Sequence, residues 1–377
     1  MSYRKACIKF KIVFLSGCFC LILNGILLAQ PPLYSISGTV LEQETNQPLA
    51  GAQVFLIGTT IGVAANSDGS FILKNIPSGI FELSVSFLGY ESVCITFNTN
   101  SIEPEYNFLL KPTVYELDEV TVRPNLKVWK ENFDEFRKNF IGTGPFSGDT
   151  KIKNPEILSF DFDPLERTLS ASANNALIIE NKALGYTINY YLDYFIINYR
   201  EGSSFFIGRT FFIPMESGRK RINNRWKNNR NKAYYGSFLH FSKALMSQRT
   251  EEEGFFARGE KRDSKARYVG ETTIPSDIYF SQSDSSTYAF SFINFINVTF
   301  RNEQEDESYL KYIWSPLDRN PRTITTFQNS SFTLLEDSVF MDKSGYLYQP
   351  NALILDGYWA FERVSDMLPI NYIPSEE

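Results

Sequence analysis

Short apolar runs alternate with polar turn segments between residues 33 and 111. In residues 81–87 every second side chain is apolar and those between are polar, the pattern of a strand with one buried and one wet face. Turn-forming residues separate the runs, as in Asn66–Gly69 and Ile76–Gly79. The predicted strands are 34–41, 52–57, 61–65, 70–73, 81–87, 91–98 and 105–110. Seven short strands in so few residues predict a β-sandwich.

Five sequence blocks in this region occur in an order and spacing known from other proteins. They are Gly38–Val40, Pro48–Val54, Asn66–Phe71, Ile76–Gly79 and Phe87–Tyr90. Through them the region resembles the carboxypeptidase regulatory-like domain, a prealbumin-like (transthyretin-like) β-sandwich. The resemblance implies a fold and no catalytic residue. In metallocarboxypeptidases this domain accompanies a zinc hydrolase, and in Gram-negative envelopes it precedes outer-membrane receptors and occurs in other exported proteins.

The region after the sandwich begins with a helical pattern and continues with strands. Residues 112–126 are expected to form a linker or an extra strand. Aromatic residues from Trp129 to Phe140 recur at helical spacing, which predicts an amphipathic helix over 127–140. The strands predicted next are 157–162, 167–171, 176–181, 186–199 and 204–213. We therefore expect a mainly β protein in which residues 127–377 form a larger β-rich α+β domain.

The longest of these strands, 186–199, is apolar on both faces. Its even-numbered positions from Ile188 to Ile196 are expected to share one face. The other face also carries apolar residues, namely Tyr191, Phe195, Ile197 and Tyr199. Such a strand is typical of the centre of a covered sheet. Its aromatic side chains would be core residues or a surface that stacks on a sugar or a peptide.

An apolar stripe predicts one long helix over 223–248. Trp226, Tyr234 and Phe241 fall on its apolar face, and His240 falls on a neighbouring face among small residues. That position is compatible with a buried structural histidine and also with one that contacts a ligand or responds to pH.

Residues 267–361 return to strand patterns, interrupted by an acidic segment at 303–307 that we expect to be an exposed loop. Several blocks of the second region occur together in other chains: Ala233–Tyr234, Gly236–Ser237, His240–Phe241, Ala244–Leu245, Glu253–Phe255, Gly357–Trp359 and Glu362–Arg363. Through these blocks the region resembles the uncharacterised portion that follows the sandwich in many exported envelope proteins. No activity is assigned to that portion, so the resemblance implies none.

The first 29 residues have the pattern of an export signal. Basic residues between Arg4 and Lys11 precede the uncharged, largely apolar segment 12–29. A signal peptide over 1–29 predicts an exported protein that is periplasmic or associated with the outer membrane. An uncleaved anchor and a lipoprotein acylated at Cys18 are the alternatives.

Loss of that segment would change the charge and the cysteine count. The chain carries 37 basic and 43 acidic residues, a net charge of −6, and four of the basic residues lie in the signal. The exported chain would carry a charge of −10 and keep only Cys94, so it could form no intramolecular disulfide. We expect Cys94 to be a small buried side chain in its alternating strand. Export and the acidic balance argue against nucleic acid as a partner.

The single histidine, His240, limits the chemistry that the chain can perform. The zinc site of the carboxypeptidases needs two histidines and a glutamate, so that activity is excluded. We find no motif for a metal or a cofactor and expect neither. A pair of carboxylates that cleaves glycosides needs no histidine, but it cannot be located among 43 acidic residues.

A basic block over 219–232 contains no acidic residue. It would be either a solvated helix surface that faces the acidic stretch Glu251–Glu253 or a patch for an anionic partner, such as lipid headgroups or an acidic glycan. The candidate binding residues are Arg219, Lys220, Arg221, Arg225, Arg230 and His240.

Two functions are compatible with these patterns. The favoured one is a non-enzymatic envelope protein whose sandwich is a binding or scaffold module, with an envelope protein or a glycan as partner and a role in outer-membrane nutrient uptake or glycan binding. The alternative is a glycoside-type hydrolase with a carboxylate pair in the second domain. A deep cleft with carboxylates about 5–10 Å apart would favour the hydrolase, and a shallow aromatic surface would favour binding.

Overall fold

The computed structural model describes residues 32–101, 105–113, 126–262, 268–273, 279–282, 287–292, 295–314, 322–342, 344–348 and 352–375. The predicted signal peptide and most of the predicted linker lie outside these residues. Within them, no helix combines the length and the apolar character needed to cross a membrane.

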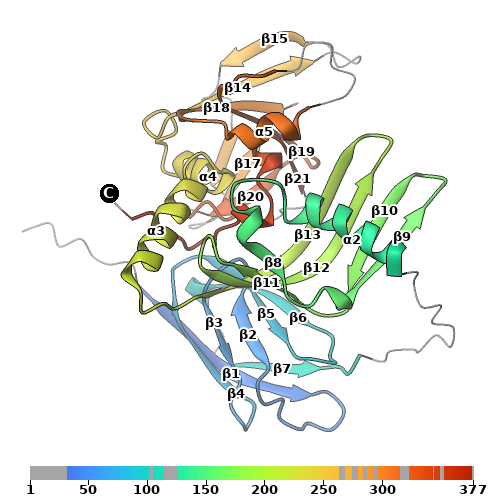
Figure 1. The fold of residues 1–377 in the computed structure, drawn as a ribbon. Coiled ribbons are helices and arrows are strands. Elements are labelled where there is room, and N and C mark those ends of the chain that lie inside the picture. The colour runs from blue at the N-terminus through green and yellow to red at the C-terminus, as the bar shows by residue number, and fades with distance from the viewer. Residues whose placement is uncertain are drawn as a thin grey trace, which may run out of the picture.

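The N-terminal region is a two-sheet sandwich of seven strands, as predicted (Figure 1). The strands are β1 (Tyr34–Glu42), β2 (Gln53–Leu56), β3 (Gly62–Ala64), β4 (Ser70–Ile76), β5 (Ile80–Ser86), β6 (Val93–Asn98) and β7 (Tyr106–Leu110). One sheet has the order β4-β1-β7 and the other β3-β2-β5-β6. The inward side chains of both sheets form one core, in which Val40, Val54 and Leu83 are fully buried.

Cys94 is exposed, so the expectation of a buried side chain is wrong. The odd-numbered positions of β6 face the core, which leaves Cys94 on the outer face. Its Sγ accepts a hydrogen bond of 3.2 Å from Nη1 of Arg209, on β13 (Ser203–Pro214) of the next sheet. Arg209 also forms an ion pair of 2.9 Å with Asp193. The thiol therefore lies at the border between the sandwich and the second region.

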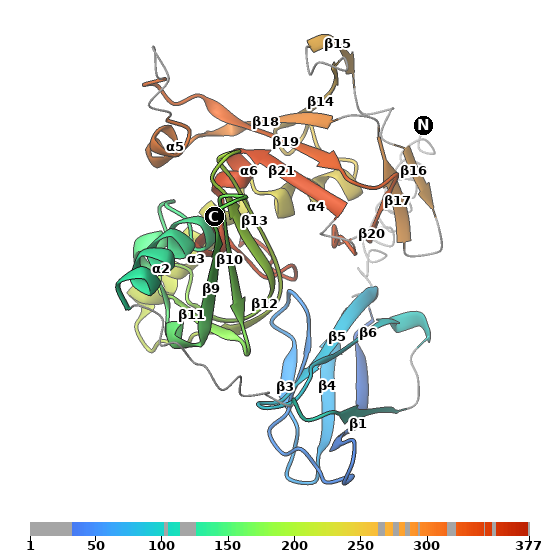
Figure 2. The same ribbon diagram turned by 90° about the vertical axis from the view of Figure 1, so that its right-hand side faces the viewer.

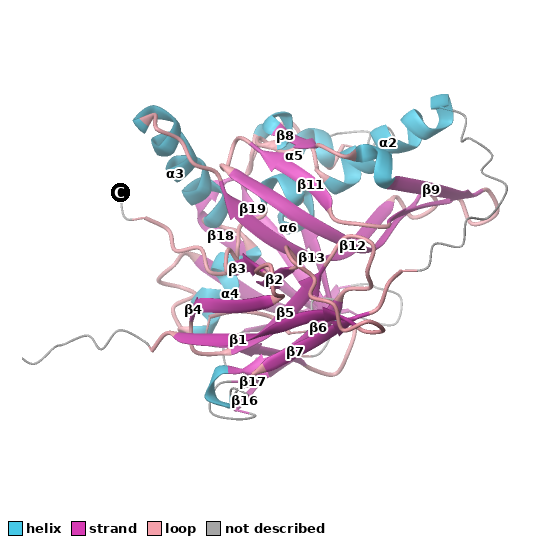
Figure 3. Cartoon of the chain, turned by 90° about the horizontal axis from the view of Figure 1, so that it is seen from below, coloured by secondary structure: helices cyan, strands magenta, loops and turns pink. Residues whose placement is uncertain are grey.

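The second region begins with α2 (Leu126–Phe140), which confirms the predicted helix, and a six-stranded sheet (Figure 3). The other strands of this sheet are β8 (Thr150–Ile152), β9 (Leu158–Asp163), β10 (Thr168–Ala173), β11 (Leu177–Asn181) and β12 (Tyr186–Asn198). β13 pairs along one edge of β12, while β10 and β11 pair with the two ends of its other edge. Phe136 and Phe140 of α2 pack on Phe195 and Tyr190, so an aromatic core lies between the helix and the sheet.

The sequence predicted that the even-numbered residues of β12 share one face along the whole strand. This prediction is wrong beyond the middle of the strand. Its register with β13 shifts between Leu192 and Tyr194, which marks a β-bulge. Even-numbered residues up to Tyr190 face the aromatic core before the bulge, and odd-numbered residues from Phe195 do so after it. The extra residue inverts the alternation, and Tyr194 is 47% exposed as a result.

A further core lies between α4 (Phe238–Met246), a five-stranded sheet and a three-stranded sheet (Figure 2). The sheets have the orders β15-β14-β18-β19-β21 and β16-β17-β20. Their elements are β14 (Phe255–Arg262), β15 (Tyr268–Thr273), β16 (Tyr279–Gln282), β17 (Thr287–Ser291), β18 (Phe295–Gln304), β19 (Phe327–Leu334), β20 (Val339–Asp342) and β21 (Leu353–Gly357), with the short helices α5 (Glu307–Tyr312) and α6 (Tyr358–Phe361). The second region is thus β-rich with segregated helices, as predicted.

The single helix predicted over 223–248 is two helices, α3 (Lys220–Tyr234) and α4. Gly236 has φ of +84°, a left-handed conformation that commonly ends a helix. Ser237 then caps α4, because its hydroxyl accepts a 3.2 Å hydrogen bond from the N–H of His240. Because α4 begins soon after α3 ends, the apolar periodicity continues across the break. The sequence pattern therefore predicted a single helix.

The acidic segment at 303–307 is not an exposed loop. Glu303 lies in β18, and Glu305 is 5% exposed. The carboxylate of Glu305 lies 2.9 Å from Nη1 of Arg322. A buried carboxylate needs such a partner, and this one is remote in the sequence.

Ring and backbone contacts join the sandwich to the second region. Phe55 stacks on Tyr191 and Phe211, with ring centroids 5.6 and 5.0 Å apart. Gly58 donates its N–H to a carbonyl of β13 and accepts a 2.8 Å hydrogen bond from Ile370 in the C-terminal tail. The sandwich, the central sheet and the tail are therefore fixed to one another.

Candidate functional site

A cleft of about 850 Å³ lies between α3, the loop before β14 and the end of β18. Its walls combine two lysines, three side-chain amides, two carboxylates and three rings. They are contributed by Lys227, Asn228, Asn231, Lys232, Tyr235, His240, Glu253, Phe300, Asn302 and Glu303.

One side of α3 fixes the helix to the turn between β11 and β12. Trp226 Nε1 donates to the carbonyl of residue 182 at 3.0 Å, and Arg225 Nη2 donates to the same oxygen at 3.3 Å. Asn229 donates to the next carbonyl at 2.8 Å. Arg230 donates to the two that follow, at 2.6 and 2.9 Å. These donors satisfy four successive carbonyls of the turn, and they leave the lysine- and asparagine-bearing side of α3 to line the cleft.

Of the six predicted binding residues, only His240 lines this cleft. Arg225 and Arg230 hold the turn, and the guanidinium of Arg230 also lies 4.1 Å from the ring centroid of Tyr186. Arg230 lines a neighbouring cavity of about 660 Å³ as well. Residues 219–221 are exposed at the start of α3. The basic block is therefore divided among a structural role, an exposed surface and the cleft, which Lys227 and Lys232 line.

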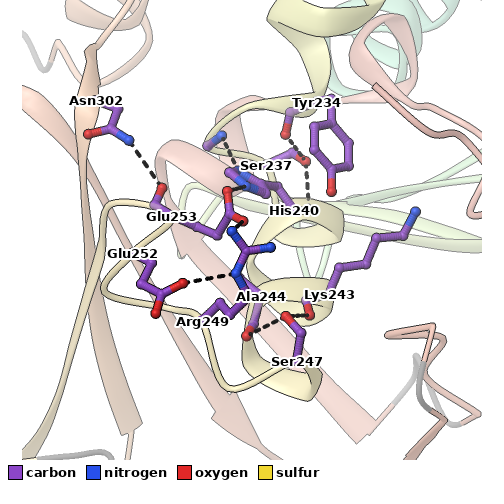
Figure 4. Close-up of polar contacts among 11 residues, drawn as sticks. Tyr234, Ser237, His240, Lys243, Ala244, Ser247, Arg249, Glu252, Glu253 and Asn302 are labelled. Atoms are coloured by element: carbon purple, nitrogen blue, oxygen red, sulfur yellow. Dashed lines mark hydrogen bonds and ion pairs between the residues drawn. The ribbon is translucent and has the colours of Figure 1, made fainter. Parts of the chain in front are cut away.

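His240 is 3% exposed and uses both ring nitrogens in hydrogen bonds (Figure 4). Nδ1 accepts the N–H of Gly236 at 3.2 Å, and Nε2 lies 3.4 Å from Oε2 of Glu253. Because a backbone N–H only donates, the proton of the neutral ring is on Nε2, which donates to the carboxylate. The imidazole thus supports the wall of the cleft through two bonds within the protein.

Four aromatic rings surround this imidazole at centroid distances of 4.7 to 5.7 Å. They belong to Tyr234, Tyr235, Phe255 and Phe300. Burial lowers the pKa of His240, and the hydrogen bond and charge of Glu253 oppose that effect. Lys243 lowers the pKa further. The histidine is therefore neutral near pH 7.

Glu253 is held in place from two sides (Figure 4). Its Oε1 lies 3.1 Å from Nη2 of Arg249, and its backbone oxygen accepts a 3.2 Å hydrogen bond from Asn302. Arg249 also binds Glu252 at 2.9 Å. Of the acidic stretch 251–253, Glu252 and Glu253 thus pair with Arg249, and Glu253 also shares the cleft with Lys227 and Lys232 of the basic block.

Glu303 is the second carboxylate of the cleft. Burial raises its pKa, and the charge of Lys232 partly offsets this. Lys232 also lies 3.7 Å from Oδ2 of Asp306, so its positive charge interacts with both Glu303 and Asp306. A carboxyl group with a raised pKa retains its proton more readily and can donate a hydrogen bond to a ligand.

Tyr235 and three asparagines are the exposed ring and the side-chain amides of the cleft, and the amide of Asn231 is already bonded to Tyr372 and Ser375. Tyr235 is 39% exposed, so part of its ring is accessible to a ligand. Asn228 is exposed beside it, and Asn231 and Asn302 line the same cleft. An aromatic face next to amides can pack on an apolar ring surface while the amides bind hydroxyl groups. Sequence reasoning missed these residues, because no periodicity or motif connects positions so far apart in the chain.

The blocks that carry the resemblance in the second region, apart from Glu362–Arg363, contribute to this cleft or to the packing behind it. Trp359 Nε1 donates to the carbonyl of Gly236 at 2.8 Å, and Phe255 packs on His240. Any Cβ at Gly236 would lie 2.1 Å from Oε1 of Gln328, so this position requires glycine. The blocks therefore form the packed support of the site.

Comparison with known proteins gives a family match for the N-terminal region. Residues 36–122 match the family described as the CarboxypepD_reg-like domain, which supports the resemblance of the sandwich. The match covers the N-terminal region and leaves the region that contains the cleft unassigned. No curated protein matches the chain.

Solved structures give only remote similarity. A cohesin–X-dockerin complex from Acetivibrio cellulolyticus is 19% identical over 20% of this chain and 56% of that chain, with a TM-score of 0.17. A putative membrane-associated protein of unknown function from Bacteroides fragilis is 16% identical over 42% and 65%, with a TM-score of 0.18. A 9R-lipoxygenase from Cyanothece is 12% identical over 58% and 48%, with a TM-score of 0.17. The chain spans less than two thirds of each, and similarity at these TM-scores carries no argument about fold or function.

Proposed function

We propose that this chain is a non-enzymatic, exported envelope protein in which the sandwich is a scaffold and the cleft beside α3 binds a glycan. The observation that carries the proposal is the accessible ring of Tyr235 in a cleft lined by three asparagines. The family match of residues 36–122 supports the scaffold part, because the resemblance implies no catalytic residue there.

The charges of the cleft favour recognition through hydroxyl groups. Lys227 and Lys232 oppose Glu253 and Glu303, so the cleft has no strong net charge to attract a simple ion. Sugar hydroxyls both donate and accept, and they suit a wall of amides, ammonium groups and carboxyls. Concave sites with an aromatic surface and a few placed polar groups are typical of small-ligand binding.

The test is a binding screen followed by calorimetry. The full chain should bind one or more oligosaccharides on an array of bacterial envelope glycans, and Tyr235→Ala should weaken that binding about tenfold, because the stacking surface is lost. Tyr194→Ala, at another exposed tyrosine outside the cleft, is the matched control and should bind like the wild type. A wild type that binds no glycan, or a Tyr235→Ala variant with unchanged affinity, would contradict the proposal.

The export part of the proposal has its own test. Fractionation of the native cell should recover the chain in the periplasm or with the outer membrane. Recovery in the cytosol would contradict it, whatever the cleft binds.

The exposed residues Arg219, Lys220 and Arg221 support a subsidiary contact with an anionic lipid surface. Their replacement by serine should weaken salt-sensitive binding to liposomes that contain phosphatidylglycerol. Binding that is unchanged by the replacement would remove the lipid contact from the proposal.

A glycoside hydrolase is the second candidate, because Glu253 and Glu303 line the same cleft and burial raises the pKa of Glu303, as a general acid requires. Both oxygens of Glu253 are already held, by His240 and Arg249, which disfavours it as a nucleophile. Turnover of chromogenic glycosides by the wild type, lowered about a hundredfold or more in Glu303→Gln, would favour this candidate. A wild type without turnover would remove it.

A further inference from the structure

A second polar pocket, of about 590 Å³, lies where the β12–β13 hairpin approaches β21 and α6 (Figure 2). Hydroxyl groups, one arginine and one aspartate line it, and two aromatic rings flank it. The lining residues are Asn139, Gly202, Ser203, Ser204, Phe295, Tyr312, Ser331, Thr333, Ile354, Leu355, Asp356, Ala360 and Arg363. It shares no lining residue with the cleft beside α3.

Arg363 is the one cation among these lining residues. Its Nη2 lies 3.2 Å from Oγ of Ser204 and 3.5 Å from the hydroxyl of Tyr312. Its guanidinium also lies 5.6 Å from the ring centroid of Phe206. In the part of the chain that the structure describes, it forms no ion pair with a carboxylate, although a guanidinium offers five N–H donors. The side chain is thus held by neutral groups, and its charge remains available to a ligand.

We propose that this pocket binds a sugar of the uronic acid type, with Arg363 on the ligand carboxylate. The planar guanidinium matches a carboxylate in a two-point contact, which a lysine cannot reproduce. The hydroxyls of Ser203, Ser331 and Thr333 provide partners for the ring hydroxyls of a sugar.

Asp356 distinguishes a sugar from a simple anion. Its carboxylate lines the same pocket and would repel any anion, and sulfate has no proton to donate to it in compensation. A sugar acid can donate hydroxyl protons to this aspartate while its own carboxylate lies on Arg363. Tyr312, which is 41% exposed, and Phe295 provide ring surface beside it. A peptide carboxyl terminus offers few hydroxyl groups and would leave most of these partners unused.

Calorimetric titration of the full chain with digalacturonate tests the proposal. We expect saturable binding that is about tenfold or more tighter than binding of the neutral disaccharide galactobiose or of trialanine with a free carboxyl terminus. Equal affinity for galactobiose would show that the ligand carboxylate does not contribute to binding, which would contradict the proposed contact with Arg363. Tighter binding of trialanine would assign the pocket to peptides, and no binding of digalacturonate would overturn the proposal.

Two variants assign that binding to this pocket. Arg363→Gln should weaken digalacturonate about tenfold or more, and Arg363→Lys should restore part of the loss. Because Arg363 also packs on Gly142, Ser203→Trp provides an independent test. Ser203 is exposed, so a tryptophan there should block the pocket and leave the core intact.

Arg200→Gln is the matched control, since Arg200 is exposed in the same hairpin and pairs with Glu166 instead. This control and Tyr235→Ala should both bind digalacturonate like the wild type, which separates the pocket from the cleft beside α3. Unchanged binding in Arg363→Gln and Ser203→Trp, with both variants folded, would overturn the proposal even if the cleft binds a glycan.

Discussion

The sandwich and the region that follows it are built from similar strands, yet they bury different chemistry. Among the described residues, the buried polar side chains of the sandwich are hydroxyls, Thr59, Ser84, Ser86 and Thr99. The second region buries His240, Glu305 and Asp342. A core without buried acidic residues, lysine, arginine or histidine suits a rigid scaffold whose stability is insensitive to pH near neutrality. A region that buries ionisable groups must hold each of them with specific partners, and its stability depends on their protonation.

The cavities also differ between the sandwich and the second region. The cleft beside α3 and the pocket around Arg363 are both lined entirely by residues of the second region. A smaller cavity of about 280 Å³ at the border is lined by residues of both regions. The proposed function makes the sandwich a scaffold and places ligand binding in the second region. Three substitutions test this division.

The largest effect is expected in the core of the sandwich. Leu83 is fully buried, and Leu83→Ala should lower the free energy of unfolding by about 2–5 kcal/mol through lost burial and a cavity. Urea denaturation at pH 5 and pH 8 should give the same loss, because no acidic residue, lysine, arginine or histidine is buried among the described residues of this core. Ile72→Ala, at an exposed position of β4, is the control and should change stability by about 0.5 kcal/mol or less. A loss that differs strongly between the two pH values would contradict the division.

An intermediate effect is expected at Asp366 in the second region. Burial raises its pKa to about 6, so the folded state binds the proton more tightly than the unfolded state. The stability from this proton is fully present below the ordinary pKa near 3.8 and is lost as pH rises through about 6. Asp366→Asn should reduce that slope, to which the raised pKa values of Glu303, Asp342 and Glu362 also contribute, and should stabilise the protein at pH 7 by about 1–3 kcal/mol.

Asp337→Asn, at an exposed position, is the control for this change and should keep the wild-type slope. Denaturation curves between pH 4 and pH 7 measure both variants. If Asp366→Asn retained the slope, the buried carboxyl would not be its source.

The smallest effect is expected at His240. Burial lowers its pKa, so below about pH 6.5 the unfolded chain binds a proton that the folded chain binds less readily. Stability should fall as the pH drops through that range, and His240→Gln should reduce this slope by about 1 kcal/mol per pH unit or less. Since the chain has one histidine, NMR titration of its ring protons reports this pKa directly. A measured pKa above 6.5 would show that the ion pair with Glu253 outweighs burial.

The sequence was a better guide to the sandwich than to the site. Alternating positions such as those of β5 sufficed for the seven strands, because one buried face fixes the register of each. The same reasoning missed the helix break at Gly236 and the bulge before Tyr194. At the first, one residue ends a helix, and at the second, one residue inverts which side chains face the core. It identified His240 as a candidate, but not Tyr235 or Asn302, because only the tertiary packing of α3 against β18 brings those two side chains to one cleft.

The central claim is that recognition takes place in the second region and not in the sandwich. Hydrogen–deuterium exchange with and without a glycan identified on the array tests this most directly. The account predicts ligand-dependent protection in 227–240 and 300–303, and none in strands 34–110. Protection confined to the sandwich would contradict it.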